Sequence, residues 1–191
     1  MRRALVVFVL ALSLVSVPDG LAEETGTYKV LATSKTSTMQ KEMQEAGDAG
    51  FRFLAVMGGE TAIGGKEVVV LMEKLKGEQA KYEYRLLATS KTSTLQKELQ
   101  EAADAGWEAV GQTVFESLMG GKETAAILEK TGDATTRVRY QYKLLATSKT
   151  STLEKEIREV VEQGYRPVAM TVGKTALGGS ELVVVTRKAV Q

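Results

Sequence analysis

The sequence contains neither cysteine nor histidine among its 191 residues. Without them the chain has no thiol nucleophile, no Ser-His or Cys-His triad, no histidine base and none of the usual zinc or copper ligand sets. The absence of cysteine also excludes disulfides and lipid attachment to a cysteine. We therefore expect a protein that is not an enzyme, holds no metal and uses no cofactor.

A large net charge of either sign is also lacking. The chain has 25 basic and 24 acidic residues, and removal of residues 1–22, which contain Arg2, Arg3 and Asp19, leaves 23 of each. A balanced chain without an arginine-rich run has no general electrostatic attraction for nucleic acid or an anionic membrane. We expect neither as a partner.

Long apolar runs are absent apart from one short run at the start. Arg2 and Arg3 precede the apolar residues 4–17, and the small residues Gly20 and Ala22 follow. This order is typical of a secretory signal peptide, and the run is shorter than the ~20 residues of a comfortable membrane span. The sequence predicts a signal peptide at 1–22, cleavage near Ala22, export to the periplasm or the medium, and no stable membrane insertion afterwards. An uncleaved N-terminal anchor is the alternative.

What the sequence does contain is a repeat. The segment Leu-Ala-Thr-Ser-Lys-Thr-Ser-Thr occurs at 31–38, 87–94 and 145–152, inside longer copies that start at Tyr28, Tyr84 and Tyr142. Thirteen of the first 23 positions are identical in all three copies, against four of the following 24. A fixed period of this kind predicts a repeat architecture. We place the units at 23–83, 84–141 and 142–191.

Each copy predicts a strand, a helix and two more strands. The alternation in Tyr84–Thr89 is typical of a strand. Behind the repeated segment, Met39, Met43 and Ala46 recur at i, i+4 and i+7, which indicates an amphipathic helix that ends at Gly50. A Gly-Gly pair then joins two strands as a hairpin. The unit is therefore βαββ.

The third strands predict how the units combine. The strand at 67–72 is apolar on both sides, which is typical of burial on both faces, while one helix covers only one face. We therefore expect an α+β fold in which three βαββ repeats form one pseudo-threefold body. Nine strands would form a continuous or barrel-like sheet with three helices on the outside, and each third strand would lie between the first and second. Three copies in one chain can replace a trimer, so we expect a monomer.

These residues resemble a known family. The opening Tyr-[Lys/Arg]-[Val/Leu]-Leu, the helix ending in Ala-Gly-aromatic or Gln-Gly-aromatic, and the Gly-rich hairpin are similar to small bacterial βαββ domains of unknown function, from Tyr28 to about Lys188. The family's acidic residue after the aromatic is present only at Glu108. The order of elements is also similar to that of dodecin, a flavin-storing shell protein. The chain has only one tryptophan, Trp107, so the resemblance implies no flavin site.

The repeated turn has two interpretations. In the first, the serines cap the helices, because Ser37, Ser93 and Ser151 stand three residues before Gln40, Gln96 and Glu154. This is the spacing of a capping box. It gives no reason why Lys35, Thr36 and Thr38 are also identical in all three copies.

In the second interpretation, the turn binds an anion, because a helix N-terminus offers free amides and a partial positive charge. The P-loop spacing is missing, so nucleotide hydrolysis is not implied. The ligand would be a phosphate, a sulfate or a carboxylated molecule. The candidate binding residues are the serine, lysine and threonines of each turn: Ser34, Lys35, Thr36, Thr38, Ser90, Lys91, Thr92, Thr94, Ser148, Lys149, Thr150 and Thr152.

Two functions follow as hypotheses. The first is an exported bacterial scaffold, structural or protein-binding, with an unknown protein partner and no enzymatic activity. The alternative is a small-ligand or anion-binding protein that uses the three repeated turns.

Overall fold

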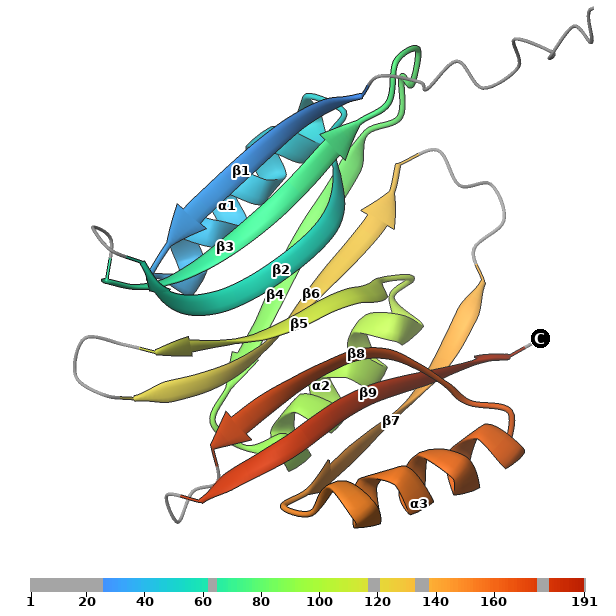
Figure 1. The fold of residues 1–191 in the computed structure, drawn as a ribbon. Coiled ribbons are helices and arrows are strands. Elements are labelled where there is room, and N and C mark those ends of the chain that lie inside the picture. The colour runs from blue at the N-terminus through green and yellow to red at the C-terminus, as the bar shows by residue number, and fades with distance from the viewer. Residues whose placement is uncertain (1–25, 62–64, 117–120, 133–137, 175–178, 191) are drawn as a thin grey trace, which may run out of the picture.

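The computed structural model describes residues 26–61, 65–116, 121–132, 138–174 and 179–190. The predicted signal peptide, residues 1–22, lies outside the described residues. In the described part, nine strands and three helices follow one another as three βαββ units (Figure 1). The predicted α+β class and the threefold repeat order are confirmed.

The three units have closely similar element lengths. Unit 1 consists of β1 (Thr27–Thr33), α1 (Thr36–Asp48), β2 (Arg52–Thr61) and β3 (Gly65–Lys74). Unit 2 consists of β4 (Tyr82–Thr89), α2 (Thr92–Asp104), β5 (Glu108–Glu116) and β6 (Lys122–Thr131). Unit 3 consists of β7 (Arg139–Thr147), α3 (Thr150–Glu162), β8 (Arg166–Lys174) and β9 (Ser180–Val190).

The strands form three separate antiparallel sheets, in the orders β1-β3-β2, β4-β6-β5 and β7-β9-β8. The predicted central position of each third strand is confirmed, because a hairpin pairs it with the second strand and the helix returns the chain to its other side. The expected continuous or barrel-like sheet is wrong. The free edges of β4 and β7 are occupied by side chains of the preceding helix, so no strand of a neighbouring unit pairs there.

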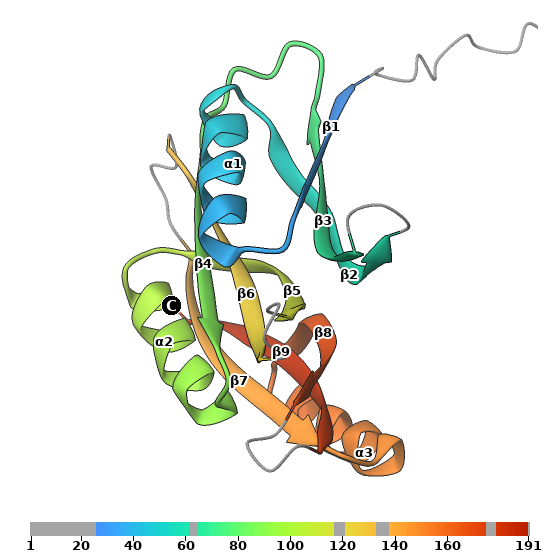
Figure 2. The same cartoon turned by 90° about the vertical axis from the view of Figure 1, so that its left-hand side faces the viewer.

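The sheets are stacked, and α1 and α2 each pack against two of them, whereas α3 packs against its own sheet alone. We call the face that carries Tyr28, Tyr84 or Tyr142 the outer face of its sheet. The outer face of sheet β4-β6-β5 packs against unit 1, and that of β7-β9-β8 packs against unit 2. Figures 1 and 2 show the three sheets following one another, with α1 lying beside β4 and α2 beside β7.

The C-terminal ends of the helices lie where their sequences predict, whereas the N-terminal ends do not. The apolar stripe of each is buried, and the glycines that follow, Gly50, Gly106 and Gly164, adopt the positive φ of 85–87° that glycine favours. The lysine repeated near the end of the third strand binds this end of the helix. Lys74 Nζ donates to the Ala49 carbonyl at 2.7 Å, and Lys188 Nζ to that of Gln163 at 2.8 Å.

The hydrophobic cores span the unit boundaries. One joins Met39 and Met43 of α1 to Tyr84 and Leu86 of β4, and a second joins unit 2 to unit 3 in the same way. The last cluster lies within unit 3 alone, under α3. Units 1 and 2 therefore share their helices with the next sheet, and unit 3 does not.

Candidate functional site

The repeated turns are not capping boxes. Each helix begins at the threonine after the lysine, so Lys35, Lys91 and Lys149 are the N-cap residues, and none makes a side-chain cap hydrogen bond. The serines lie inside the first turn, where they are exposed. The preceding threonine orders the turn instead, since Thr33 Oγ1 accepts from the Lys35 amide at 3.2 Å, and units 2 and 3 repeat this contact. The capping-box interpretation is wrong because the helix starts two residues earlier than it requires.

The anion-binding residues are only partly brought together. Ser34, Lys35 and Thr36 line one side of a hollow of about 290 Å³ that also contains Glu123 of unit 2. The equivalent turn of unit 2 faces the equivalent carboxylate, with Thr92 Oγ1 at 3.4 Å from Glu181 Oε2. A carboxylate beside the turn repels an anion.

The other candidate residues lie differently. The threonines Thr38, Thr94 and Thr152 are half-buried on the first helical turn. In unit 3, Ser148, Lys149 and Thr150 are exposed. Ser90 and Lys91 of unit 2 are exposed as well. The anion site stays a prediction.

A pair of glutamines on α1 binds the free edge of β4. Gln44 Oε1 accepts from the Tyr84 amide at 2.9 Å while its Nε2 donates to the Tyr82 carbonyl at 3.4 Å, and Gln40 Oε1 accepts from the Leu86 amide at 3.0 Å. Backbone groups of an edge strand would otherwise be open to pairing with another strand. The side-chain amides thus close this edge.

The same contacts recur one unit later. Gln100 accepts from the Tyr142 amide at 3.0 Å, and Gln96 accepts from the Leu144 amide at 2.6 Å. Gln96 also donates to the Tyr142 carbonyl at 3.0 Å. The glutamine contacts are therefore a regular part of the interface between consecutive units.

A tyrosine hydroxyl joins unit 2 to a bulge in unit 1, and another joins unit 3 to a bulge in unit 2. The second strand of each unit has a bulge near its start, between Phe53 and Ala55 in unit 1. The Phe53 amide donates to the Tyr84 hydroxyl at 2.7 Å, and the Ala109 amide donates to the Tyr142 hydroxyl at 2.7 Å. Both tyrosine rings are buried, at 3% exposure. The hydroxyl satisfies an amide that the bulge leaves without a strand partner.

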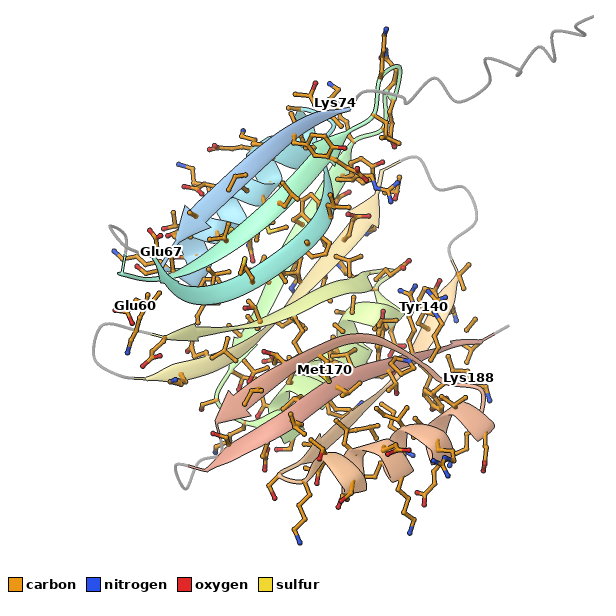
Figure 3. The ribbon with its side chains drawn as sticks, in the orientation of Figure 1. Glu60, Glu67, Lys74, Tyr140, Met170 and Lys188 are labelled. Carbon is orange, nitrogen blue, oxygen red and sulfur yellow. The ribbon has the colours of Figure 1, made fainter. Side chains whose placement is uncertain are left out.

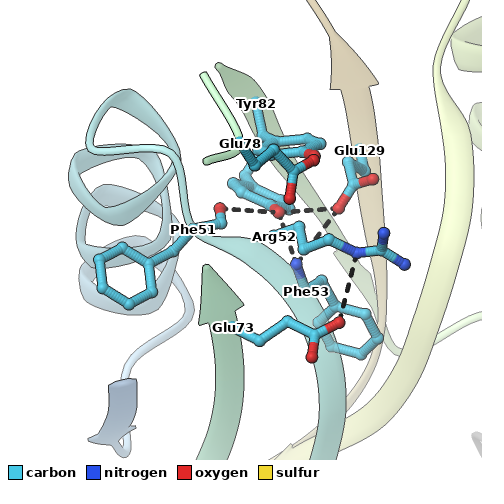
Figure 4. A network of polar contacts seen from close by, with 8 residues as sticks. Phe51, Arg52, Phe53, Glu73, Glu78, Tyr82 and Glu129 are labelled. Carbon is cyan, nitrogen blue, oxygen red and sulfur yellow. Dashed lines mark hydrogen bonds and ion pairs between the residues drawn. The ribbon is translucent and has the colours of Figure 1, made fainter. Parts of the chain in front are cut away.

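Figure 4 shows the polar network around the first of these contacts. The Tyr84 hydroxyl donates to Glu129 Oε2 at 2.7 Å, and the Phe53 amide lies 3.3 Å from the same oxygen. Burial raises the pKa of Glu129 above its ordinary value, although these hydrogen bonds oppose the shift. In unit 3 the equivalent residue is Arg187, which pairs with Glu108 of unit 2. The network joins neighbouring units rather than facing an open pocket.

Close contact between the units requires small residues. A Cβ on Gly47 of α1 would lie 2.2 Å from the Tyr82 carbonyl oxygen, and a Cβ on Gly111 of β5 would lie 2.5 Å from the Phe53 ring. The position equivalent to Gly47 in α2 is Ala103, which is buried. The helices of units 1 and 2 can approach the next strand because this position is small.

A groove of about 460 Å³ runs along β2 and β5 and is lined by Glu60, Lys66, Glu116 and Lys122. Glu116 lies 2.6 Å from Lys66 Nζ and 2.9 Å from Lys122 Nζ. Hydrogen bonds from these two lysines hold the pKa of Glu116 below its ordinary value. A carboxylate held ionised between two ammonium groups does not serve as a proton donor, so this cluster is an ion-pair link between units 1 and 2.

One outer face is not covered. In unit 1, Tyr28 and Val30 of β1 are 59% and 63% exposed, whereas their equivalents Tyr84 and Leu86 are 3% and 8% exposed. Met57 of β2 lies on the same face, as its pairing with Val69 shows, and is also exposed. Within the described residues, no side chain binds the free edge of β1. This face, the N-terminal face, is the half of the inter-unit interface that nothing in the described chain fills.

Comparisons with known proteins do not place the chain in a family. No family model matches the chain, and no curated protein or solved structure is similar to it. The resemblance to small bacterial βαββ domains is therefore supported at the level of three similar βαββ units and no further.

The described part of the chain contains neither a candidate membrane-spanning helix nor a candidate metal-binding cluster. No helix there has the length and apolar character needed to cross a membrane. No three His, Cys, Asp or Glu side chains there are grouped so as to hold a metal ion.

Proposed function

We propose that the protein is an exported, non-enzymatic scaffold that binds another protein through its N-terminal face. The observation that carries this proposal is the exposure of Tyr28 and Val30 at positions that the same chain buries in units 2 and 3. An exposed cluster of large apolar side chains on a sheet is typical of a protein-interaction site. The absence of cysteine and histidine supports a binding role over catalysis.

The chemistry of the face also supports a protein partner. Tyr28, Val30, Val69 and Leu71 form an apolar patch, and the adjoining edge of β1 offers backbone donors and acceptors. Proteins recognise such edges through main-chain hydrogen bonds and apolar side chains together. A small anion would use neither.

The test is an affinity-capture experiment. The mature protein is immobilised and incubated with the exported proteins of the producing cells, and the proteins that it retains are identified. A Val30→Lys variant places a charge on the N-terminal face. A Met170→Lys variant is the matched control, because Met170 is equally exposed, at 63%, but lies on β8 at the other end of the stack (Figure 3). The proposal expects a protein that wild type and Met170→Lys retain and Val30→Lys does not. Equal retention by all three, or retention of nothing, would contradict it.

Export itself is part of the proposal. Cleavage after Ala22 would leave a chain of 169 of the 191 residues, beginning at Glu23. Intact mass and N-terminal sequencing of the protein recovered from the periplasm or medium test this. A full-length chain in the membrane fraction would support the uncleaved anchor instead.

The second candidate function is anion binding at the repeated turns. It is favoured by Lys35, Lys91 and Lys149, which stand at the positive ends of three helices. The carboxylates beside the first two turns oppose it. Its test is described with the other predictions below.

A further inference from the structure

The two ends of the stack are not equivalent, and the difference identifies the kind of partner. Resting on the proposed binding role of the N-terminal face, we propose that this face receives a βαββ unit of a different polypeptide. The partner's helix would carry the pattern Gln-x-x-x-Gln-x-x-Gly/Ala, which α1 and α2 carry, and a second copy of this chain is not the partner.

The chain itself shows twice what fills such a face. Three features of the preceding unit make the contact: two glutamines on the helix, a glycine or alanine three residues after the second, and a free amide in the bulge of the second strand. In unit 1 these are Gln40, Gln44, Gly47 and the Phe53 amide. In unit 2 they are Gln96, Gln100, Ala103 and the Ala109 amide.

Unit 3 has lost every one of these features. Glu154 and Arg158 replace the two glutamines and bind each other at 3.0 Å. A carboxylate cannot donate to a strand carbonyl, and a guanidinium cannot accept from a strand amide, as the glutamines do. Val161 replaces the small residue and is 49% exposed.

The fourth change is Pro167, which stands where units 1 and 2 have Phe53 and Ala109. Proline has no backbone N–H, so no tyrosine hydroxyl can bind at this bulge. The C-terminal end of the stack is thus closed by four substitutions that act on four separate contacts.

The N-terminal face has lost nothing. Tyr28 keeps the hydroxyl that Tyr84 and Tyr142 use, and Val30 keeps an apolar side chain at the position of Leu86. Because β1 and β4 share the same register with their central strands, the amides of Tyr28 and Val30 point to the free edge as those of Tyr84 and Leu86 do. The N-terminal face therefore keeps the groups that units 2 and 3 use, and no part of the described chain covers it.

A second copy does not fit this face through its free end. A head-to-tail contact between the end of one copy and the face of the next would not close, and would build filaments. The substitutions in unit 3 remove that contact. The partner must therefore bring its own helix of the α1 type.

The test restores the missing features and uses the wild-type chain as the receiver. The donor variant carries E154Q, R158Q, V161A and P167A, with V30K added so that its own face is blocked. Mixed with wild type, it should form a heterodimer by native mass spectrometry and sedimentation. Mixed with a V30K chain, it should form none. Wild type alone should remain a monomer.

Each outcome is decisive. A folded donor variant that shows no added mass with wild type overturns the proposal. A wild-type dimer that V30K dissolves overturns the exclusion of a second copy. If the donor variant does not fold, a chain with residues 26–81 duplicated before Gly26 serves instead. The amides of the original Tyr28 and Val30 should then become protected from exchange, and unchanged exchange overturns the proposal.

The experiment also separates this inference from the proposed function. If wild type retains a partner that Val30→Lys loses, but no α1-type unit binds, the scaffold function stands and the partner class is wrong. If neither result is obtained, both fail.

Discussion

Replacing Tyr142 with phenylalanine removes one oxygen atom from the interface between units 2 and 3. The Tyr142 hydroxyl accepts from the Ala109 amide at 2.7 Å, and both residues are buried. Phenylalanine keeps the ring but leaves that amide without a partner. A buried donor left unsatisfied costs ~1–3 kcal/mol of the free energy of unfolding. For a chain of this size, a loss of about 2 kcal/mol lowers the Tm by roughly 4–8 °C.

Tyr28→Phe is the matched control, because the same side chain at the equivalent position of unit 1 is 59% exposed. Its expected change is within about 0.5 kcal/mol, as for most surface substitutions. Thermal and urea unfolding of the two variants beside wild type give the comparison. If Tyr28→Phe destabilises the protein as much as Tyr142→Phe, or if neither does, the hydroxyl does not join the units as described here.

Three further predictions test other parts of the structure. Burial raises the pKa of Glu129, so the folded state binds this proton more tightly, and stability is lost as pH rises from about 4.5 through the folded pKa. Wild type should therefore lose Tm relative to Glu129→Gln across that window, and parallel Tm curves would contradict the assignment. Gly47→Val should destabilise the protein by about 3 kcal/mol in urea unfolding through overlap with the Tyr82 carbonyl, whereas Val161→Ala should change little. If the turns bind anions, phosphate or sulfate should raise the Tm of wild type but not that of a variant in which Lys35, Lys91 and Lys149 are all replaced by alanine. Equal shifts of the two Tm values would exclude a role for these lysines.

Much of each unit could be predicted from its sequence, because local patterns determine it. The stripe formed by Met39, Met43 and Ala46 placed the helix, and Gly50 placed its end. The central position of the third strand follows from the hairpin and the handedness of the crossover. These features depend on contacts within one unit, and the structure confirms them.

The relation between units was predicted less well. Gln40 stands three residues after Ser37, and this local spacing favoured a capping box, but the glutamine binds β4 of the next unit. A side chain at an interface binds residues far along the chain, and the spacing of neighbouring residues does not predict such contacts. The same glutamines close the edge of β4, which is why the nine strands do not form one sheet.

A signal for the interface was nevertheless present in the sequence. The glutamine pair, the small residue and the bulge position agree in character between units 1 and 2 and change together in unit 3. Comparing the copies by their order in the chain, rather than by their shared residues, would have indicated the stack and its closed end. The repeated lysines of the turns have no structural role that these contacts explain.

The central claim is that the free edge of β1 in unit 1 is uncovered, whereas the preceding unit covers the equivalent edges of β4 and β7. Amide hydrogen exchange on the wild-type protein tests this claim most directly. The amides of Tyr84 and Leu86 are bound by glutamines of α1, and those of Tyr28 and Val30 lie at the equivalent edge, where no side chain of the described residues binds them. We predict slow exchange at Tyr84 and Leu86 and fast exchange at Tyr28 and Val30 in the isolated protein. Equal protection of the two pairs would show that β1 is already covered, and would contradict the account.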